Sequence, residues 1–285
     1  MDGRTMDTSE RRNSFDATAA RERCRKYRLR ILEISQQVGA LHMAGAYSCT
    51  EAVDAFYNVL MRRAGAQSPS PKSPDTFLMS KGHGCMIQYV VLEDIGVLPR
   101  KDLDLYCKKE GRLGCHPDYG NPGIEASTGS LGHGLSMAVG MAYAERLKKN
   151  GGQVFVVLSD GEMQEGSTWE ALMMASSLKL ENIVLFIDNN DFQSLGRTSE
   201  THPSFYPVVD KLVAFGWEAV EFDGHDSRAI VEAVWARRGG KPLALVGKTT
   251  KGKGLSFMEN QPIWHYRAPN KQEYEQALKE LGVAP

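Results

Sequence analysis

Several features that mark other classes of protein are missing from this sequence. The five cysteines are scattered, odd in number and free of any CxxC pair, so we expect neither a disulfide framework nor a zinc site. Reduced thiols of this kind are typical of the cytoplasm. The charged N-terminal segment lacks the apolar core of a secretory signal, and no apolar run is long enough for a membrane-spanning helix.

The chain also lacks an excess of charge of either sign. Lys and Arg total 34 and Asp and Glu total 35, for a net charge of -1. Proteins that bind nucleic acids usually carry a basic surplus, so we expect neither a nucleic-acid nor a membrane partner. The 285 residues, 42% of them hydrophobic, are ordinary for a globular chain of one large or two small domains.

Hydrophobic periodicity divides the chain into a tail and one folded domain. Residues 1–15 are polar, and we expect a disordered tail there, followed by a single domain at 16–285. The patterns predict a Pro/Ser-rich loop at 65–75, strands at 154–159, 183–187, 217–222 and 243–246, and helices at 17–38, 50–63, 135–146, 169–178, 207–214, 226–237 and 271–281. Such alternation predicts an α/β fold with a parallel sheet covered by helices on both faces.

Two neighbouring strand ends carry polar residues suited to a phosphate and a metal ion. Asp160 and Gly161 follow the first buried strand, and Asn190 follows the second. Ligands of open parallel sheets gather at the carboxyl ends of the strands. Carboxylate and amide oxygens are donors that Mg²⁺ prefers, and a glycine lets the backbone approach a phosphate. An Asp-Gly turn or an Asn-rich loop alone is commonplace, but the pair on consecutive strand ends favours a ligand site.

Four of the seven histidines lie in Gly/Pro-rich or polar surroundings: His42, His83, His116 and His265. A single histidine is more often structural than catalytic. As a group, these four are candidates for holding phosphates and moving protons. The Gly-rich stretch 127–134 (STGSLGHG) offers another close approach to a ligand, although it is not the dinucleotide-binding fingerprint.

Taken in order, these motifs resemble the N-terminal, diphosphate-binding half of transketolase. The matching segments, which together span roughly residues 20–280, are SKGHG (80–84), GCHPD (114–118), STGSLGHG (127–134), SDGEMQEG (159–166) and the KTTKGKG…WH run (248–265). Ser159 stands where that family usually has a glycine. The resemblance implies the thiamine-diphosphate-binding fold, with thiamine diphosphate and Mg²⁺ as cofactors.

The resemblance also implies roles for individual residues. The metal ligands would be Asp160, Asn190 and the main-chain carbonyl of Phe192. The cofactor-binding residues would be His83, Gly129, Ser130, Leu131, Asp160, Gly161, Glu162, Asn190 and His265. The catalytic residues would be four histidines that line the sugar channel and a glutamate that links two active sites across a dimer: His42, His83, His116, His265 and Glu165.

Full transketolases carry a second domain of similar size, and this chain ends at Pro285 before any such domain. We therefore expect the N-terminal subunit of a split enzyme, with a C-terminal, pyrimidine-binding partner subunit of about 300 residues. Two-fold symmetry favours a hetero-tetramer. The expected reaction moves a two-carbon ketol unit from a ketose or ketose phosphate to an aldose or aldose phosphate.

Other readings stay open. The enzyme could act on a non-standard sugar of specialised metabolism, or have chemistry like that of deoxyxylulose-phosphate synthase or a pyruvate dehydrogenase subunit. The four histidines favour sugar ketol transfer over the chemistry of these two relatives, because they suit a polyhydroxylated substrate. A non-catalytic subunit is the remaining alternative, and the Asp160 and Asn190 pair argues against it because such a subunit need not keep metal ligands.

Overall fold

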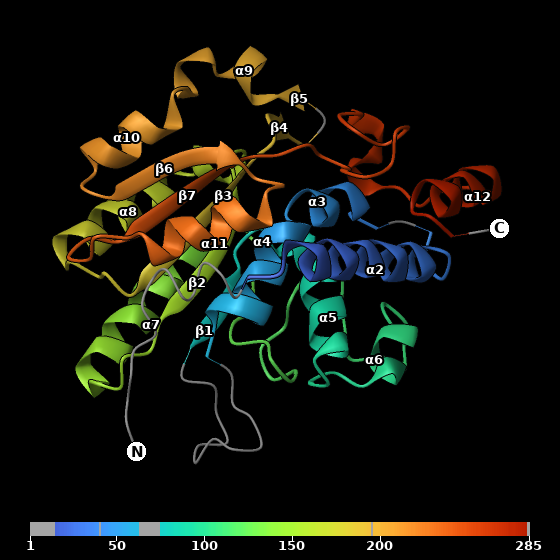
Figure 1. Cartoon of the computed structure of the whole chain (residues 1–285), viewed down its shortest axis with the longest axis horizontal. Helices are drawn as coiled ribbons and strands as arrows, with labels where there is room; N and C mark the ends of the chain where they lie inside the picture. Colours follow the sequence, from blue (N-terminus) through green and yellow to red (C-terminus); the bar gives the residue numbers. More distant parts are fainter. Residues whose placement is uncertain (1–14, 40, 63–74, 195, 284–285) are drawn as a thin grey trace.

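The computed structural model describes residues 15–39, 41–62, 75–194 and 196–283. At its centre lies a five-stranded, wholly parallel sheet with the strand order β1-β2-β3-β7-β6 (Figure 1). The strands are β1 (Thr76–Met79), β2 (Val154–Ser159), β3 (Ile183–Asn189), β6 (Glu218–Asp223) and β7 (Leu243–Lys248). A short antiparallel pair, β4 (Phe192–Gln193) and β5 (Gly196–Arg197), follows β3.

Helices cover both faces of the sheet, which confirms the predicted α/β fold. One face packs against α2 (Ala17–Ser35), α4 (Thr50–Ala55), α5 (Cys85–Asp94) and α11 (Ser227–Trp235). The other packs against α7 (Gly134–Lys148), α8 (Gly166–Ser177) and α10 (Val208–Ala214). Strands buried on both faces read as continuous apolar runs, because alternate side chains enter opposite layers.

The remaining elements, most of them short, lie between these helices and strands or follow them. They are α3 (Met43–Ser48), η1 (Phe56–Leu60), η2 (Gly82–Gly84), α6 (Arg100–Asp104), η3 (Glu162–Gln164), α9 (Thr198–Thr201), η4 (Pro203–Phe205), η5 (Pro262–Tyr266) and α12 (Lys271–Glu280). Figure 1 shows α12, near the C-terminus, lying beside α2 from the start of the chain. None of the helices within the described ranges has both the length and the apolar character needed to cross a membrane.

Side-chain caps set several helix starts. Asp16 accepts the N–H groups of Thr18 and Ala19 at 2.9 Å, which explains why α2 begins where the sequence pattern placed it. Asp226 caps α11 in the same way. Asn270 and Glu273 form a reciprocal capping box at the start of α12.

The structure differs from the sequence prediction in a few elements. The predicted helix 17–38 ends at Ser35, and the α-helical part of 50–63 ends at Ala55, where a π-helical turn (η1) continues to Leu60. Strand β1 and helices α5 and α6 were not predicted. The predicted tail 1–15 and loop 65–75 lie outside the described residues, apart from Phe15, which is buried in the core, and Asp75.

The sheet topology determines where the functional residues meet. Because the five strands are parallel, their carboxyl ends share one edge of the sheet. The segments that follow β1, β2, β3 and β7 carry Lys81, Asp160, Asn190 and Lys251 respectively. Residues that are far apart in sequence therefore converge at this edge, as is common for ligand sites of open parallel sheets.

Candidate functional site

The loops at the carboxyl edge of the sheet enclose a cavity of about 370 Å³. That volume lies within the range of small-ligand sites. Its lining comes from the loops after β1, β2, β3 and β7, from the segment between α6 and α7, and from residues around α3 and η5. The lining residues are His42, Gly45, Lys81, His83, His116, Gly129, Leu131, Ser159, Gly161, Gln164, Glu165, Asn190, Phe192, Gln193, Ser194, Lys251 and His265. All four histidines singled out in the sequence line this one cavity.

The four histidines form a cluster centred on His42. The ring of His42 lies 5.5 Å from that of His83, 6.1 Å from that of His116 and 5.2 Å from that of His265, between centroids. Burial, with the positive potential of His265, lowers the pKa of His42 to about 4. Burial, with the positive charge of Lys251, likewise lowers the pKa of His265 to about 4.

The pKa of His83 falls well below its ordinary value, again mainly through burial. At neutral pH, His42, His83 and His265 are therefore neutral imidazoles. A neutral imidazole carries one donor and one acceptor nitrogen, so each of these rings can both give and take a proton.

Lys251 controls the proton position on His265. Its side chain is buried, and its Nζ atom lies 3.1 Å from His265 Nδ1 and 3.1 Å from the carbonyl oxygen of Ser194. Burial, with the charge of Lys81, lowers the pKa of Lys251 to about 8. The ammonium form donates to Nδ1, which leaves the single ring proton of His265 on Nε2.

The predicted metal ligands lie at the ends of β2 and β3. The Asp160 carboxylate is fully buried and accepts the N–H of Gly161 at 2.9 Å and that of Asp191 at 2.6 Å. Both of these donors are main-chain groups and not cationic side chains. Burial, followed by the charge of Asp188, raises the pKa of Asp160 to about 7.

Asn190 and Phe192 supply two further oxygens. The Asn190 side chain lines the cavity, and its Oδ1 atom accepts the N–H of Phe192 at 3.1 Å. A Cβ atom on Gly161 would lie 3.3 Å from the carbonyl oxygen of Phe192, so this carbonyl sits directly against Gly161. A carboxylate, an amide oxygen and a main-chain carbonyl make a hard donor set that suits Mg²⁺.

The clustered histidines do not form a metal site of their own. Across residues 15–39, 41–62, 75–194 and 196–283, no group of three or more His, Cys, Asp or Glu side chains is arranged to hold a metal ion. A cation at the ends of β2 and β3 would therefore have one carboxylate, that of Asp160, and would depend otherwise on amide and carbonyl oxygens and on a ligand's own atoms.

The Gly-rich loop passes close to His116. Gly129 has a φ of 142°, and a Cβ atom there would lie 2.8 Å from Cδ2 of His116. Only glycine fits this approach without displacing the ring. Leu131 also lines the cavity, whereas Ser130 is exposed and lies outside the lining.

The two predicted glutamates have different surroundings. Glu162 is buried outside the cavity lining, and its Oε1 atom accepts the hydroxyl of Ser80 at 2.6 Å and the N–H of Gly132 at 3.1 Å. It thereby joins the loop after β1 to the Gly-rich loop. Glu165 lines the cavity and is exposed in the single chain.

Several residues that line the cavity were not among the site residues predicted from the sequence. Lys81 and Gln164 lie within quoted motifs, and Lys251 lies in the lysine-rich KTTKGKG run, so a signal was available. The Nε2 atom of Gln164 is buried and has no hydrogen-bond partner in the described part of the chain. Tyr266 lies outside the lining, but its ring centroid is 4.5 Å from that of His42.

Comparison with known proteins gives one consistent result. Residues 21–285 match the family model described as "Transketolase, thiamine diphosphate binding domain". The chain is 38% identical to one of the subunits of the apulose-4-phosphate transketolase of Phocaeicola vulgatus, over 90% of this chain and 92% of that protein. It is 36% identical to a 6-deoxy-6-sulfo-D-fructose transketolase subunit of Clostridium sp., over 88% and 91% of the two chains.

Longer relatives match over only part of their length. Human transketolase is 31% identical over 97% of this chain but only 44% of its own. The solved structure of transketolase from Leishmania mexicana superimposes with a TM-score of 0.84 and 27% identity, covering 95% of this chain and 42% of that one. The chain thus spans less than half the length of these two proteins.

Proposed function

The chain belongs to the thiamine-diphosphate-binding domain family of the transketolases, and we propose that it is the N-terminal subunit of a two-chain transketolase. The relatives named as subunits match it over nearly their whole length, which supports this reading. Residues 16–285 then act as one cofactor-binding domain, and a C-terminal, pyrimidine-binding subunit completes the active site. Two copies of each chain would give a hetero-tetramer with two-fold symmetry.

One observation carries the proposal. A single cavity brings Asn190 and Phe192 together with four clustered histidines and two buried lysines. The buried Asp160 lies outside the lining, but its chain neighbours Ser159 and Gly161 are part of it. The oxygens at the strand ends suit Mg²⁺, and Lys251 and the neutral rings suit a diphosphate and polyhydroxylated sugars. This combination of groups fits thiamine diphosphate better than a simple sugar site.

The residues present fit the cofactor. Asp160, Asn190 and the carbonyl of Phe192 would hold Mg²⁺, while Gly161, His83 and His265 would lie near the diphosphate. The Gly129 to Leu131 backbone would approach the aminopyrimidine. When bound, thiamine diphosphate supplies a nucleophilic carbon that takes over a two-carbon unit from a ketose and passes it to an aldose.

The chain's own groups then bind the sugars and move their protons. His42 and His116 border the same space and can hold substrate hydroxyl groups. Because Lys251 occupies Nδ1 of His265, only the Nε2–H of that ring is available to donate to a sugar oxygen. Such general acid and base steps contribute about 10²- to 10⁴-fold each. The exposed Glu165 would become buried against a second copy of the site.

The named relatives support an anionic sugar as substrate. Apulose-4-phosphate carries a phosphate and 6-deoxy-6-sulfo-D-fructose a sulfonate, and both differ from the sugars of ordinary transketolase. We therefore propose a ketose donor of this kind in preference to a pyruvate-type substrate. The cytoplasm is the proposed location, in keeping with five unpaired cysteines.

Co-purification and turnover test this function. The tagged chain is isolated from its native host, and proteins that accompany it in equal amounts are identified by mass. A stoichiometric partner with a pyrimidine-binding domain, and transfer of a two-carbon unit between sugars by the pair, is the expected result. Release of carbon dioxide from pyruvate would point to the alternative chemistry, and a partnerless chain that binds no cofactor would point to a non-catalytic role.

A further inference from the structure

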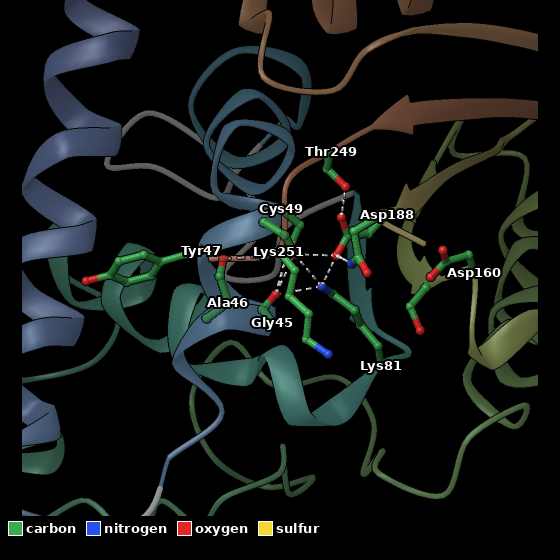
Figure 2. A network of polar contacts seen from close by, with 12 residues as sticks. Gly45, Ala46, Tyr47, Cys49, Lys81, Asp160, Asp188, Thr249 and Lys251 are labelled. Carbon is green, nitrogen blue, oxygen red and sulfur yellow. Dashed lines mark hydrogen bonds and ion pairs between the residues drawn. The ribbon is translucent and has the colours of Figure 1, made fainter. Parts of the chain in front are cut away.

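The carboxylate of Asp188, near the end of β3, is the centre of a buried polar network (Figure 2). Its Oδ2 atom accepts Lys81 Nζ at 2.5 Å, Ser48 Oγ at 2.5 Å and Asn190 Nδ2 at 3.0 Å. Its Oδ1 atom accepts the hydroxyl of Thr249. These donors come from α3 and from the segments at the ends of β1, β3 and β7, so the network joins four parts of the chain that border the cavity.

Lys81 forms a buried ion pair with Asp188. The two side chains are 1% and 0% exposed. Burial on its own would raise the pKa of Asp188, but the ammonium group outweighs it and holds that pKa below its usual range. Burial would likewise lower the pKa of Lys81, and Asp188 reverses the direction. Their Nζ and Oδ2 atoms lie 2.5 Å apart, and a hydrogen bond between charged groups is stronger than one between neutral groups.

The contact with Asp188 fixes the orientation of the Asn190 side-chain amide. Its NH₂ group donates to Asp188, and its Oδ1 atom accepts the N–H of Phe192. A half-turn of the amide would place its oxygen against the carboxylate and its NH₂ against the N–H of Phe192, and both contacts would be repulsive. Asp188 itself does not line the cavity, whereas Asn190 does.

We propose that Asp188 is a positioning residue that fixes the Asn190 amide oxygen as a ligand for a divalent cation. Lys81 and Ser48 donate to the same Oδ2 atom that accepts the Asn190 NH₂ group, and so hold this buried acceptor in place. The inference rests on the proposed function, because it takes Asn190 to be a cation ligand. Partners that orient metal ligands typically change metal affinity about 10- to 100-fold when they are removed.

Matched variants distinguish an effect on the orientation of Asn190 from an effect on the stability of the protein. The double variant K81M/D188L removes both charges at similar volume, and such replacements of buried ion pairs are often neutral for folding. It removes the acceptor of the Asn190 NH₂ group without leaving a buried charge unpaired. The variant D188N keeps Lys81 in the cavity wall. The control T249V removes one donor to Asp188 and keeps the contact with Asn190.

The first measurement needs no ligand. The side-chain amide of Asn190 is observed by nuclear magnetic resonance of the ¹⁵N-asparagine-labelled full chain, and its signal is assigned through its loss in N190A. In the wild type and T249V, we expect the NH₂ protons to exchange slowly with water. In K81M/D188L, we expect fast exchange. Equally slow exchange in a folded double variant would overturn the orienting role.

The second measurement is the Mg²⁺ concentration that half-saturates binding of thiamine diphosphate, determined by calorimetry at excess cofactor. We expect it to rise about 10- to 100-fold in K81M/D188L and D188N and by less than about tenfold in T249V, with similar melting temperatures for the double variant and the control. An unchanged Mg²⁺ requirement in the folded double variant would contradict the proposal. If the wild type binds neither Mg²⁺ nor the cofactor even together with its partner subunit, the proposed function fails, and the amide-exchange comparison still decides the orientation.

Discussion

The Asp160 carboxylate accepts the main-chain N–H of Asp191 at 2.6 Å and thereby joins the end of β2 to the end of β3. This contact brings a buried carboxylate beside the segment that carries Asn190 and Phe192. The end of β2 supplies one of the three predicted donors, Asp160, and the segment after β3 supplies the other two, Asn190 and Phe192. The predicted cation site is therefore a product of the parallel pairing between β2 and β3, in which Ser159 lies opposite Asp188.

Replacement of Asp160 by asparagine is expected to weaken Mg²⁺-dependent binding of thiamine diphosphate by at least tenfold, or about 1.4 kcal/mol. The change removes the charged oxygen of the donor set and keeps the size of the side chain. Calorimetric titration measures it. The exposed Asp210 on α10 provides the control, because D210N removes a carboxylate that is not part of the cavity lining. Equal binding by both variants would show that Asp160 is not a ligand.

Alanine at Gly129 is expected to displace His116 and to reduce cofactor affinity at least tenfold, because a Cβ atom there would meet the ring at 2.8 Å. The matched control is G140A, in the interior of α7, where a Cβ atom would meet nothing within 4 Å. G140A should raise the unfolding free energy by about 0.5–1 kcal/mol. Cofactor titration and urea unfolding measure the two effects. Undiminished affinity in G129A would contradict the assigned close approach.

The histidine cluster predicts a pH dependence of stability. His42 and His265 have folded-state pKa values of about 4, below the ordinary value of 6.5. Between these values the unfolded chain binds more protons than the folded one, so stability falls as the pH drops from about 6.5 to about 4. Above about 6.5 these two groups add no further pH dependence.

The double variant H42N/H265N should flatten this loss of stability on acidification. Urea unfolding at several pH values between 4.5 and 7.5 measures it. The exposed His202, replaced by asparagine, is the control for loss of a histidine elsewhere. If the double variant loses stability on acidification as steeply as the wild type, the two rings are not the groups that titrate.

The contact between Lys251 and His265 predicts that removal of the lysine changes the pKa of His265. The variant K251M removes the ammonium group that lies 3.1 Å from Nδ1 of that ring. The pKa of His265 should rise above about 4 and stay below 6.5, because burial, the larger cause of its depression, remains. A titration of the ring signals by nuclear magnetic resonance measures it. K253M, which removes a partly exposed lysine of the same run, should leave His265 unchanged.

Much of the fold follows from the pattern of apolar residues. Strand β2 covers residues 154–159 as predicted, since every side chain in it is buried and the run is continuous. Strand β1 escaped prediction because it has only four residues and directly follows a Pro/Ser-rich segment. Helix α5 escaped as well: its side chains are buried on nearly all sides, so its sequence shows little periodicity.

The site was harder to derive from sequence than the fold. The pairing of Asp160 with Asn190 could be inferred, because consecutive parallel strands end at one edge. Contacts such as Lys81 with Asp188, which are separated by 107 positions, depend on side-chain packing that no local pattern records. The roles of the four histidines came from a family resemblance, and the structure adds that their rings share one cavity.

Cofactor content tests the central claim most directly. The tagged chain is purified from its native host together with whatever accompanies it, and bound thiamine diphosphate is released, oxidised to a fluorescent product and counted per chain. The account predicts one thiamine diphosphate per copy of this chain, lost on removal of Mg²⁺ and reduced in the D160N variant. A chain that remains free of cofactor in the presence of its partner, Mg²⁺ and excess thiamine diphosphate would contradict it.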